Sequence, residues 1–158
     1  GHERGEVPGD VLLERIAGSA ARPLDRAELR AHWLSMFEPW DEMFTLASGL
    51  KADYRVYLLS NIGDMHWAHL DSLYGLDALV HGACASFRVG AIKPHVDIYR
   101  KAEVMFDLDP SATVFLDDLL PNVTAARECG WHAIHHIDAG LTRSQLRTLG
   151  VRLPAPFT

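Results

Sequence analysis

The segment at residues 114–130 constrains the fold of this chain more than any other part of the sequence. A short apolar run, Val-Phe-Leu, is followed directly by Asp117 and Asp118. A helical segment then begins at about Asn122, which we expect to be its N-cap. Two adjacent carboxylates at the end of a buried strand are costly unless a cation or a basic group lies beside them. Because carboxylate oxygens are natural ligands of Mg²⁺, the pattern indicates metal-assisted chemistry.

Composition limits the classes of protein to which the chain can belong. It has 158 residues, 48% of them hydrophobic and 23% charged, which suits one globular domain with a real core. The net charge of −6 and the scattered Lys and Arg residues argue against a nucleic-acid partner. No apolar run reaches the length of a membrane span, so we expect a cytoplasmic protein without a membrane partner. Cys84 and Cys129 lie among apolar or helical neighbours and are predicted to be buried free thiols.

The chain changes character near Tyr54. Residues 1–52 read as helical, and residues 53–158 alternate between strand-like and helix-like patterns. Such alternation predicts βαβ units, with a parallel sheet covered by helices on both faces. We therefore expect a helical N-terminal segment and an α/β core that together form one compact unit. Within the core, the predicted strands cover residues 54–60, 79–86, 113–116 and 131–135, and the last helix is predicted to begin at Thr142.

Polar residues fall at the ends of two predicted strands. Ser60 and Asn61 end the first, and Asp117 and Asp118 end the third. In open α/β sheets, ligands bind at the carboxyl ends of the strands. Lys93, which precedes a proline at an expected helix start, supplies a nearby cation.

These three motifs, in this order, resemble the haloacid dehalogenase superfamily. They are Leu-Leu-Ser-Asn at 58–61, Lys-Pro at 93–94 and Asp-Asp-x-x-x-Asn at 117–122. Within that superfamily, the likeness is to the phosphatase-like branch that includes the N-terminal domain of soluble epoxide hydrolases. The resemblance covers most of the chain and implies a Rossmann-like parallel sheet.

The resemblance also implies roles for individual residues. Ser60 would donate a hydrogen bond to a phosphoryl oxygen, helped by backbone N–H groups near Asn61. Lys93 would neutralise phosphoryl charge. Asp117 would bind Mg²⁺, and Asp118 would bind it through water or would orient Lys93.

The chain departs from the family in one respect. Members of the family begin with an apolar strand whose first Asp is the covalent nucleophile, and this sequence has no such strand. We therefore interpret residues 1–52 as a remnant of the helical cap and the fold as lacking its first, central strand. Unpaired inner edges would cost about 1–3 kcal/mol per buried group. Either the flanking strands close up, or a second chain covers or fills the gap, and we expect a homodimer on this argument.

Two histidines offer an alternative metal site. His66 and His69 are three residues apart on one predicted helix, close to the Ser60 strand end. Imidazoles can bind Zn²⁺ or another transition metal. Histidine pairs without a third fixed ligand are more often surface residues, so this alternative stays secondary.

Two functions follow from these residues. The first is hydrolysis of a small phosphorylated substrate by a phosphatase or phosphodiesterase. It would use Mg²⁺, Mn²⁺ or Zn²⁺ and would replace the missing aspartate with metal-activated water. The second is a non-catalytic remnant or interaction module of the same fold.

Overall fold

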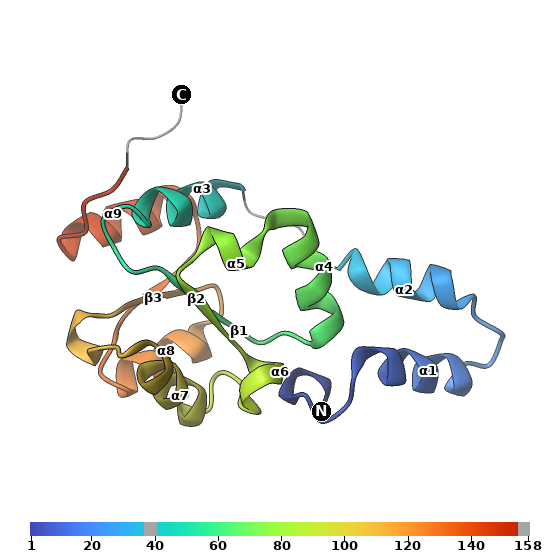
Figure 1. The fold of residues 1–158 in the computed structure, drawn as a ribbon. Coiled ribbons are helices and arrows are strands. Elements are labelled where there is room, and N and C mark those ends of the chain that lie inside the picture. Colours follow the sequence, from blue (N-terminus) through green and yellow to red (C-terminus); the bar gives the residue numbers. More distant parts are fainter. Residues whose placement is uncertain (37–40, 155–158) are drawn as a thin grey trace.

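The computed structural model, which describes residues 1–36 and 41–154, is an α/β protein with short parallel strands between helices (Figure 1). Its strands are β1 (Tyr57–Ser60), β2 (Gly82–Ala85), β3 (Val114–Asp117) and β4 (His132–His135). Strand β1 pairs in parallel with β2, and β3 pairs in parallel with β4. The predicted alternation of strands and helices after Tyr54 is therefore confirmed.

Helices precede the first strand, connect the strands to one another and follow the last strand. Before the first strand they are η1 (His2–Arg4), α1 (Gly9–Ser19), α2 (Arg26–Leu34) and α3 (Asp41–Leu50). After it come α4 (Asp64–Tyr74), α5 (Leu76–Leu79), α6 (Ser86–Val89), α7 (Val96–Phe106), η2 (Pro110–Ala112), α8 (Leu120–Glu128) and α9 (Ala139–Thr148). None of the helices in the described ranges is both long and apolar enough to cross a membrane.

The helices cover the strands from two sides, as Figure 1 shows, with α7 and α8 on one side and α3, α5 and α9 on the other. Residues of α7 and α8 pack against Leu59 of β1 and Phe115 of β3 in one apolar cluster. On the other side, Leu46 of α3 packs with Ile134 of β4 and Leu146 of α9. Burial on both faces is what a parallel arrangement requires.

The packing between α7 and the strands is centred on aromatic rings. Tyr99 is fully buried and makes edge-to-face contacts with Phe115 and Trp131, with ring centroids 5.8 and 5.5 Å apart. Its hydroxyl donates a hydrogen bond of 2.8 Å to the carbonyl of Asn122 in α8. This contact ties α7 to the first turn of the helix that follows Asp117.

The helices before β1 differ in their position relative to the strands. Helices α1 and α2 extend away from the strands, whereas α3 lies against α9 (Figure 1). Asp25 caps α2 by accepting hydrogen bonds from the amides of Ala27 and Glu28. Within residues 1–52, α3 therefore shares the apolar core of the strand-bearing part.

The strands of the described residues form two separate parallel pairs, whereas the sequence analysis expected one parallel sheet that lacks its central strand. Strands β1 and β3, which we expected to flank a missing strand, are not hydrogen-bonded to each other among the described residues. Of the two ways to close the gap, direct pairing of these strands is therefore not the one adopted.

Two predicted helix caps are wrong. Asn122 lies inside α8, which begins at Leu120, and its side chain turns back toward Asp117 instead of capping the helix. Thr142 lies inside α9, where Asp138 is the N-cap and accepts a hydrogen bond from the amide of Leu141. In both cases the helix begins earlier, and the polar side chain bonds to a neighbouring strand end or loop. By contrast, Cys84 and Cys129 are buried free thiols, as predicted.

Shortening Ile98 tests the core between α7 and the strands. Ile98 is fully buried, whereas Val104 on the same helix is 86% exposed. We expect Ile98→Ala to lower the free energy of unfolding by about 2–5 kcal/mol through the cavity that it leaves. The matched variant Val104→Ala should change it by less than about 0.5 kcal/mol. Urea denaturation measures both, and equal losses would contradict this description of the core.

Candidate active site at the strand ends

A buried ion pair joins the carboxyl ends of the two strand pairs. Lys93 Nζ lies 2.6 Å from Asp117 Oδ2, and the two side chains are 11% and 4% exposed. The same ammonium donates a hydrogen bond of 2.8 Å to the carbonyl of Leu59 in β1. It also lies 5.5 Å from the ring centroid of Phe115. One cation thus holds the end of β1 close to the end of β3.

The second oxygen of Asp117 is also engaged. Oδ1 accepts hydrogen bonds from the amide of Leu119 at 2.9 Å and from Nδ2 of Asn122 at 2.8 Å. Because three donors surround this carboxylate, the strand end can carry a buried negative charge. Asn122 is therefore a positioning residue for Asp117.

Asn61 fixes the main chain of Lys93. Its Nδ2 donates to the Lys93 carbonyl at 2.9 Å, and its Oδ1 accepts from the Lys93 amide at 2.7 Å. The peptide bond between Lys93 and Pro94 is cis, and α7 begins three residues after Lys93. Lys93 therefore lies in the loop before the helix and not at the predicted helix start.

The loop after β1 is held in place by Ser86. The buried Ser86 hydroxyl accepts from the amide of Ile62 at 2.9 Å and donates to its carbonyl at 3.1 Å. Ser60, the last residue of β1, is half-buried just before this loop. The structure thus brings Ser60, Asn61 and Lys93 together at one end of β1.

Asp118 differs from Asp117 in its exposure. Its residue is exposed, and its main-chain carbonyl lies 2.9 Å from Nε2 of His135 on the neighbouring strand. The partner of Lys93 is Asp117, whereas the family resemblance offered Asp118 as a residue that could orient this lysine. The exposed Asp118 carboxylate is therefore the one that a cation from solvent can reach most easily.

These carboxylates fit Mg²⁺ better than they fit a metal with an all-protein ligand set. Within residues 1–36 and 41–154, no three His, Cys, Asp or Glu side chains are grouped closely enough to hold a metal ion. Mg²⁺ is usually held by one or two carboxylates together with water and substrate phosphate. Asp118, with Asp117 beside it, meets that requirement.

The histidine alternative does not form a ligand group in this part of the chain. His66 is buried, its Nε2 lies 2.7 Å from the carbonyl of Trp33, and its ring stacks on Trp33 at 5.4 Å. His69 lies one turn further along α4 and belongs to no group of three ligands among the described residues. His66 thus joins α2 to α4, which is a structural contact.

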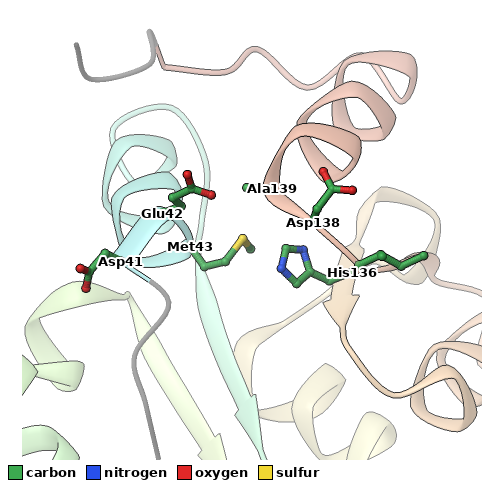
Figure 2. Close-up of a pocket in the computed structure, with 7 residues that line it drawn as sticks. Asp41, Glu42, Met43, His136, Asp138 and Ala139 are labelled. Atoms are coloured by element: carbon green, nitrogen blue, oxygen red, sulfur yellow. The ribbon is translucent and has the colours of Figure 1, made fainter.

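A separate hollow of about 350 Å³ lies between the start of α3 and the loop after β4. Figure 2 shows the Met43 side chain and the His136 ring reaching toward one another across it, while Asp41 points away. His136 Nδ1 lies 2.6 Å from the hydroxyl of Thr142. This hollow does not include Lys93 or Asp117, so we place the candidate site at the ion pair and not there.

Burial changes the acidity of groups behind the site. Burial, with the charge of Asp117 as a second cause, raises the pKa of Tyr99. The Tyr99 phenol therefore stays protonated and keeps donating to Asn122 at neutral pH. Burial also raises the pKa of the Cys84 thiol, which makes it a poor nucleophile.

Sequence reasoning found part of this arrangement. It selected Ser60, Asn61, Lys93 and the two acids. It missed Ser86, because a serine after a short strand carries no signal of its own. It also misread Asn122, although the five-residue spacing from Asp117 was visible as part of the Asp-Asp-x-x-x-Asn motif.

Comparison with known proteins finds similarity to two phosphatases. The chain is 25% identical over 154 residues to a D-ribitol-5-phosphate phosphatase of Bacteroides thetaiotaomicron, covering 93% of this chain and 75% of the relative. It is 28% identical over 151 residues to a sesquiterpene phosphatase of Aspergillus oryzae, covering 93% and 76%. No protein-family model matches the chain.

Solved structures show the same architecture. A HAD-family enzyme of Bacteroides thetaiotaomicron, solved with magnesium and inorganic phosphate, superposes with a TM-score of 0.79 at 22% identity, covering 89% of this chain and 76% of that one. The chain has a haloacid-dehalogenase-like fold. We therefore interpret its strand-end residues by comparison with phosphatases of the haloacid dehalogenase (HAD) type, to which the chain is similar.

Removing the charge of Asp117 tests the ion pair. We expect Asp117→Asn to lower the free energy of unfolding by about 3–5 kcal/mol, because a buried ammonium loses its only ionic partner among the described residues. The control is Glu14→Gln, which breaks the exposed pair between Glu14 and Arg26 and should cost less than about 1 kcal/mol. If urea denaturation gives the same small loss for both variants, the pair at the strand ends is not the buried contact described above.

Proposed function

We propose that this chain is a HAD-like hydrolase that cleaves a small phosphoester with the help of a divalent cation. The observation that carries the proposal is the buried Lys93–Asp117 pair at the strand ends, beside Ser60 and the exposed Asp118. The similarity to a ribitol-phosphate phosphatase and a sesquiterpene phosphatase supports the reaction class. The magnesium and phosphate held by the solved HAD-family enzyme support the cation and the phosphoryl ligand.

The residues of the site would have different roles in phosphoryl transfer. Such a reaction needs mainly positioning and stabilisation of charge. Two of the three Lys93 ammonium hydrogens point to Leu59 and Asp117, which leaves the third for a phosphoryl oxygen. The Ser60 hydroxyl would donate to a second phosphoryl oxygen, and Asp117 would keep Lys93 in place.

Asp118, with Asp117 beside it, would hold the cation, with Mg²⁺ preferred over Mn²⁺ or Zn²⁺. When bound, such a cation supplies stabilisation of phosphoryl charge and activation of water for attack. In the net reaction, the water oxygen bonds to phosphorus and the ester P–O bond breaks. One water proton passes to the leaving alcohol, so that phosphate and an alcohol are formed.

We also propose that the chain represents this fold without its first strand and the aspartate that the strand carries. Two observations support this proposal: the strand pairs are separate, and no third carboxylate of the described residues joins Asp117 and Asp118. The same two observations favour the second candidate function, a non-catalytic module that keeps the shape of the site. The structure describes one chain, so the homodimer expected from the sequence stays a prediction.

Activity measurements with and without EDTA separate these two functions. The enzyme proposal expects hydrolysis of a chromogenic phosphomonoester or phosphodiester in the presence of Mg²⁺, Mn²⁺ or Zn²⁺, and loss of that hydrolysis with EDTA. If none of the three metals supports turnover of either ester, the chain is the non-catalytic module.

Removing the Asp118 carboxylate tests the proposed cation site. We expect Asp118→Ala to reduce the metal-dependent rate by at least about a hundredfold, because the exposed ligand is lost while the Lys93–Asp117 pair stays. The matched control is Asp109→Ala, an exposed acid before the other end of β3, where it caps η2 and accepts a hydrogen bond from the Ser111 hydroxyl. A rate that survives Asp118→Ala but falls with Asp109→Ala would contradict the site.

A further inference from the structure

The main chain of Lys93 belongs to neither of the helices beside it. The one-turn helix α6 ends at Gly90, whose φ of 67° turns the chain away, and α7 begins only at Val96. Among the described residues, the main-chain N–H and C=O of Lys93 bond only to the side chain of Asn61. The position of the lysine backbone therefore depends on the position of Asn61.

The residue after Asn61 is held by a single hydroxyl. The main-chain N–H and C=O of Ile62, which is 4% exposed, both bond to the Ser86 hydroxyl, at 2.9 and 3.1 Å. Neither group has another main-chain partner in the part of the chain that the structure describes. Ser86 itself is fully buried, so water does not replace this hydroxyl on the surface.

The segment from Ser86 to Lys93 is thus fastened at both of its ends to the loop after β1. Its first residue holds Ile62, and its last residue is held by Asn61. Loss of the Ser86 hydroxyl would leave two buried main-chain groups of Ile62 unpaired, which is costly. The loop would move to find other partners for them, and Asn61, as the neighbouring residue, would move with it.

The position of the backbone matters because the lysine side chain is long. Its Nζ must reach the Leu59 carbonyl and the Asp117 carboxylate at the same time, at 2.8 and 2.6 Å. Ordering a lysine side chain costs conformational entropy, and a fixed backbone limits the arrangements from which this geometry is selected. A donor that is already ordered before its ligand arrives binds that ligand more tightly.

We propose that Ser86 is a positioning residue for Lys93 and acts on it through Ile62 and Asn61. By fixing the lysine backbone, the Ser86 hydroxyl sets where the third ammonium hydrogen meets a phosphoryl oxygen. The effect on phosphate rests on the proposed function, whereas the effect on the Lys93 backbone does not.

Packing of the Ile62 side chain is the alternative explanation for the order of this loop. That side chain lies in an apolar cluster with Trp67, Leu76 and Ala85. Apolar packing is not directional, so it holds the side chain without fixing the orientation of the peptide groups on either side. If packing were sufficient, loss of the Ser86 hydroxyl would destabilise the fold but leave Lys93 in place.

Amide exchange of the full chain, measured by NMR, separates these two explanations. We expect Ser86→Ala to speed exchange at the Lys93 amide about tenfold relative to the Ala102 amide in the middle of α7. The matched control is Thr142→Val, because Thr142 is also fully buried and its hydroxyl contacts His136 instead of the loop after β1. In this control the ratio of the two exchange rates should not change.

Phosphate binding gives a second readout for the same variants. In calorimetric titrations of inorganic phosphate with Mg²⁺, we expect Ser86→Ala to weaken binding at least about fivefold and Thr142→Val to change it less than about twofold. If Ser86→Ala does not fold, Ser86→Cys takes its place, since a thiol keeps a weak donor and acceptor. It should shift both readouts in the same direction by a smaller factor.

The double variant Asn61→Ala/Ser86→Ala tests the route of the effect. Because Ser86 acts through Asn61, we expect the double variant to exchange at Lys93 no faster than Asn61→Ala alone. Faster exchange in the double variant would mean that Ser86 reaches Lys93 by another route and would overturn the inference.

Three further results would overturn it. In the first, the exchange ratio at Lys93 is the same in Ser86→Ala as in the unmodified chain. In the second, Thr142→Val changes that ratio as much as Ser86→Ala does. In the third, the unmodified chain and Ser86→Ala bind phosphate equally well. If the unmodified chain binds no phosphate, the proposed function fails, and the Lys93 amide alone decides whether Ser86 positions this residue.

Discussion

The contact on which the rest of this structure depends is the ammonium of Lys93. It bonds to a backbone carbonyl of β1 and to the carboxylate at the end of β3, and these strands belong to pairs that share no backbone hydrogen bond among the described residues. A buried lysine is costly without an ionic partner, and a buried aspartate is costly for the same reason. Each therefore needs the other. This mutual requirement keeps the two halves of the fold in register at the end where ligands of α/β proteins bind.

The surrounding residues fix the geometry of this pair. Asn61 holds the main chain of Lys93 through two hydrogen bonds, and Asn122 holds the far oxygen of Asp117. The Tyr99 hydroxyl, whose pKa is raised by burial, donates a hydrogen bond to the main-chain carbonyl of Asn122 and so holds Asn122 in place. The geometry of the site therefore depends on the core. Packing of α7 positions Tyr99, the Tyr99 hydroxyl holds the start of α8, and Asn122 of α8 orients the Asp117 carboxylate.

The order of strands and helices and most residues of the candidate site could be predicted from the sequence. The predictions that were wrong have physical reasons. Strand and helix order followed from periodicity, because burial of one face imposes a regular spacing on apolar residues. Ser60 and Asp117 were selected because ligands of α/β proteins bind where parallel strands end, and polar side chains gather there. The position of Asn122 was misjudged because an asparagine near a helix start bonds equally well to the helix or to a neighbouring strand end, and only the tertiary structure decides between them. The sequence analysis expected a gap between β1 and β3, but it could not decide whether these strands would pair directly, because local patterns do not encode contacts between distant strands.

The central claim is that the strand ends form a phosphate-handling site around one lysine. The most direct test is calorimetric titration of inorganic phosphate in the presence of Mg²⁺, comparing the unmodified chain with Lys93→Met, which keeps the length of the side chain and removes its charge. We expect the variant to stay folded by circular dichroism and to bind phosphate at least about tenfold more weakly, since a buried charge-assisted hydrogen bond is lost. Equal affinity of the two proteins for phosphate would contradict the claim.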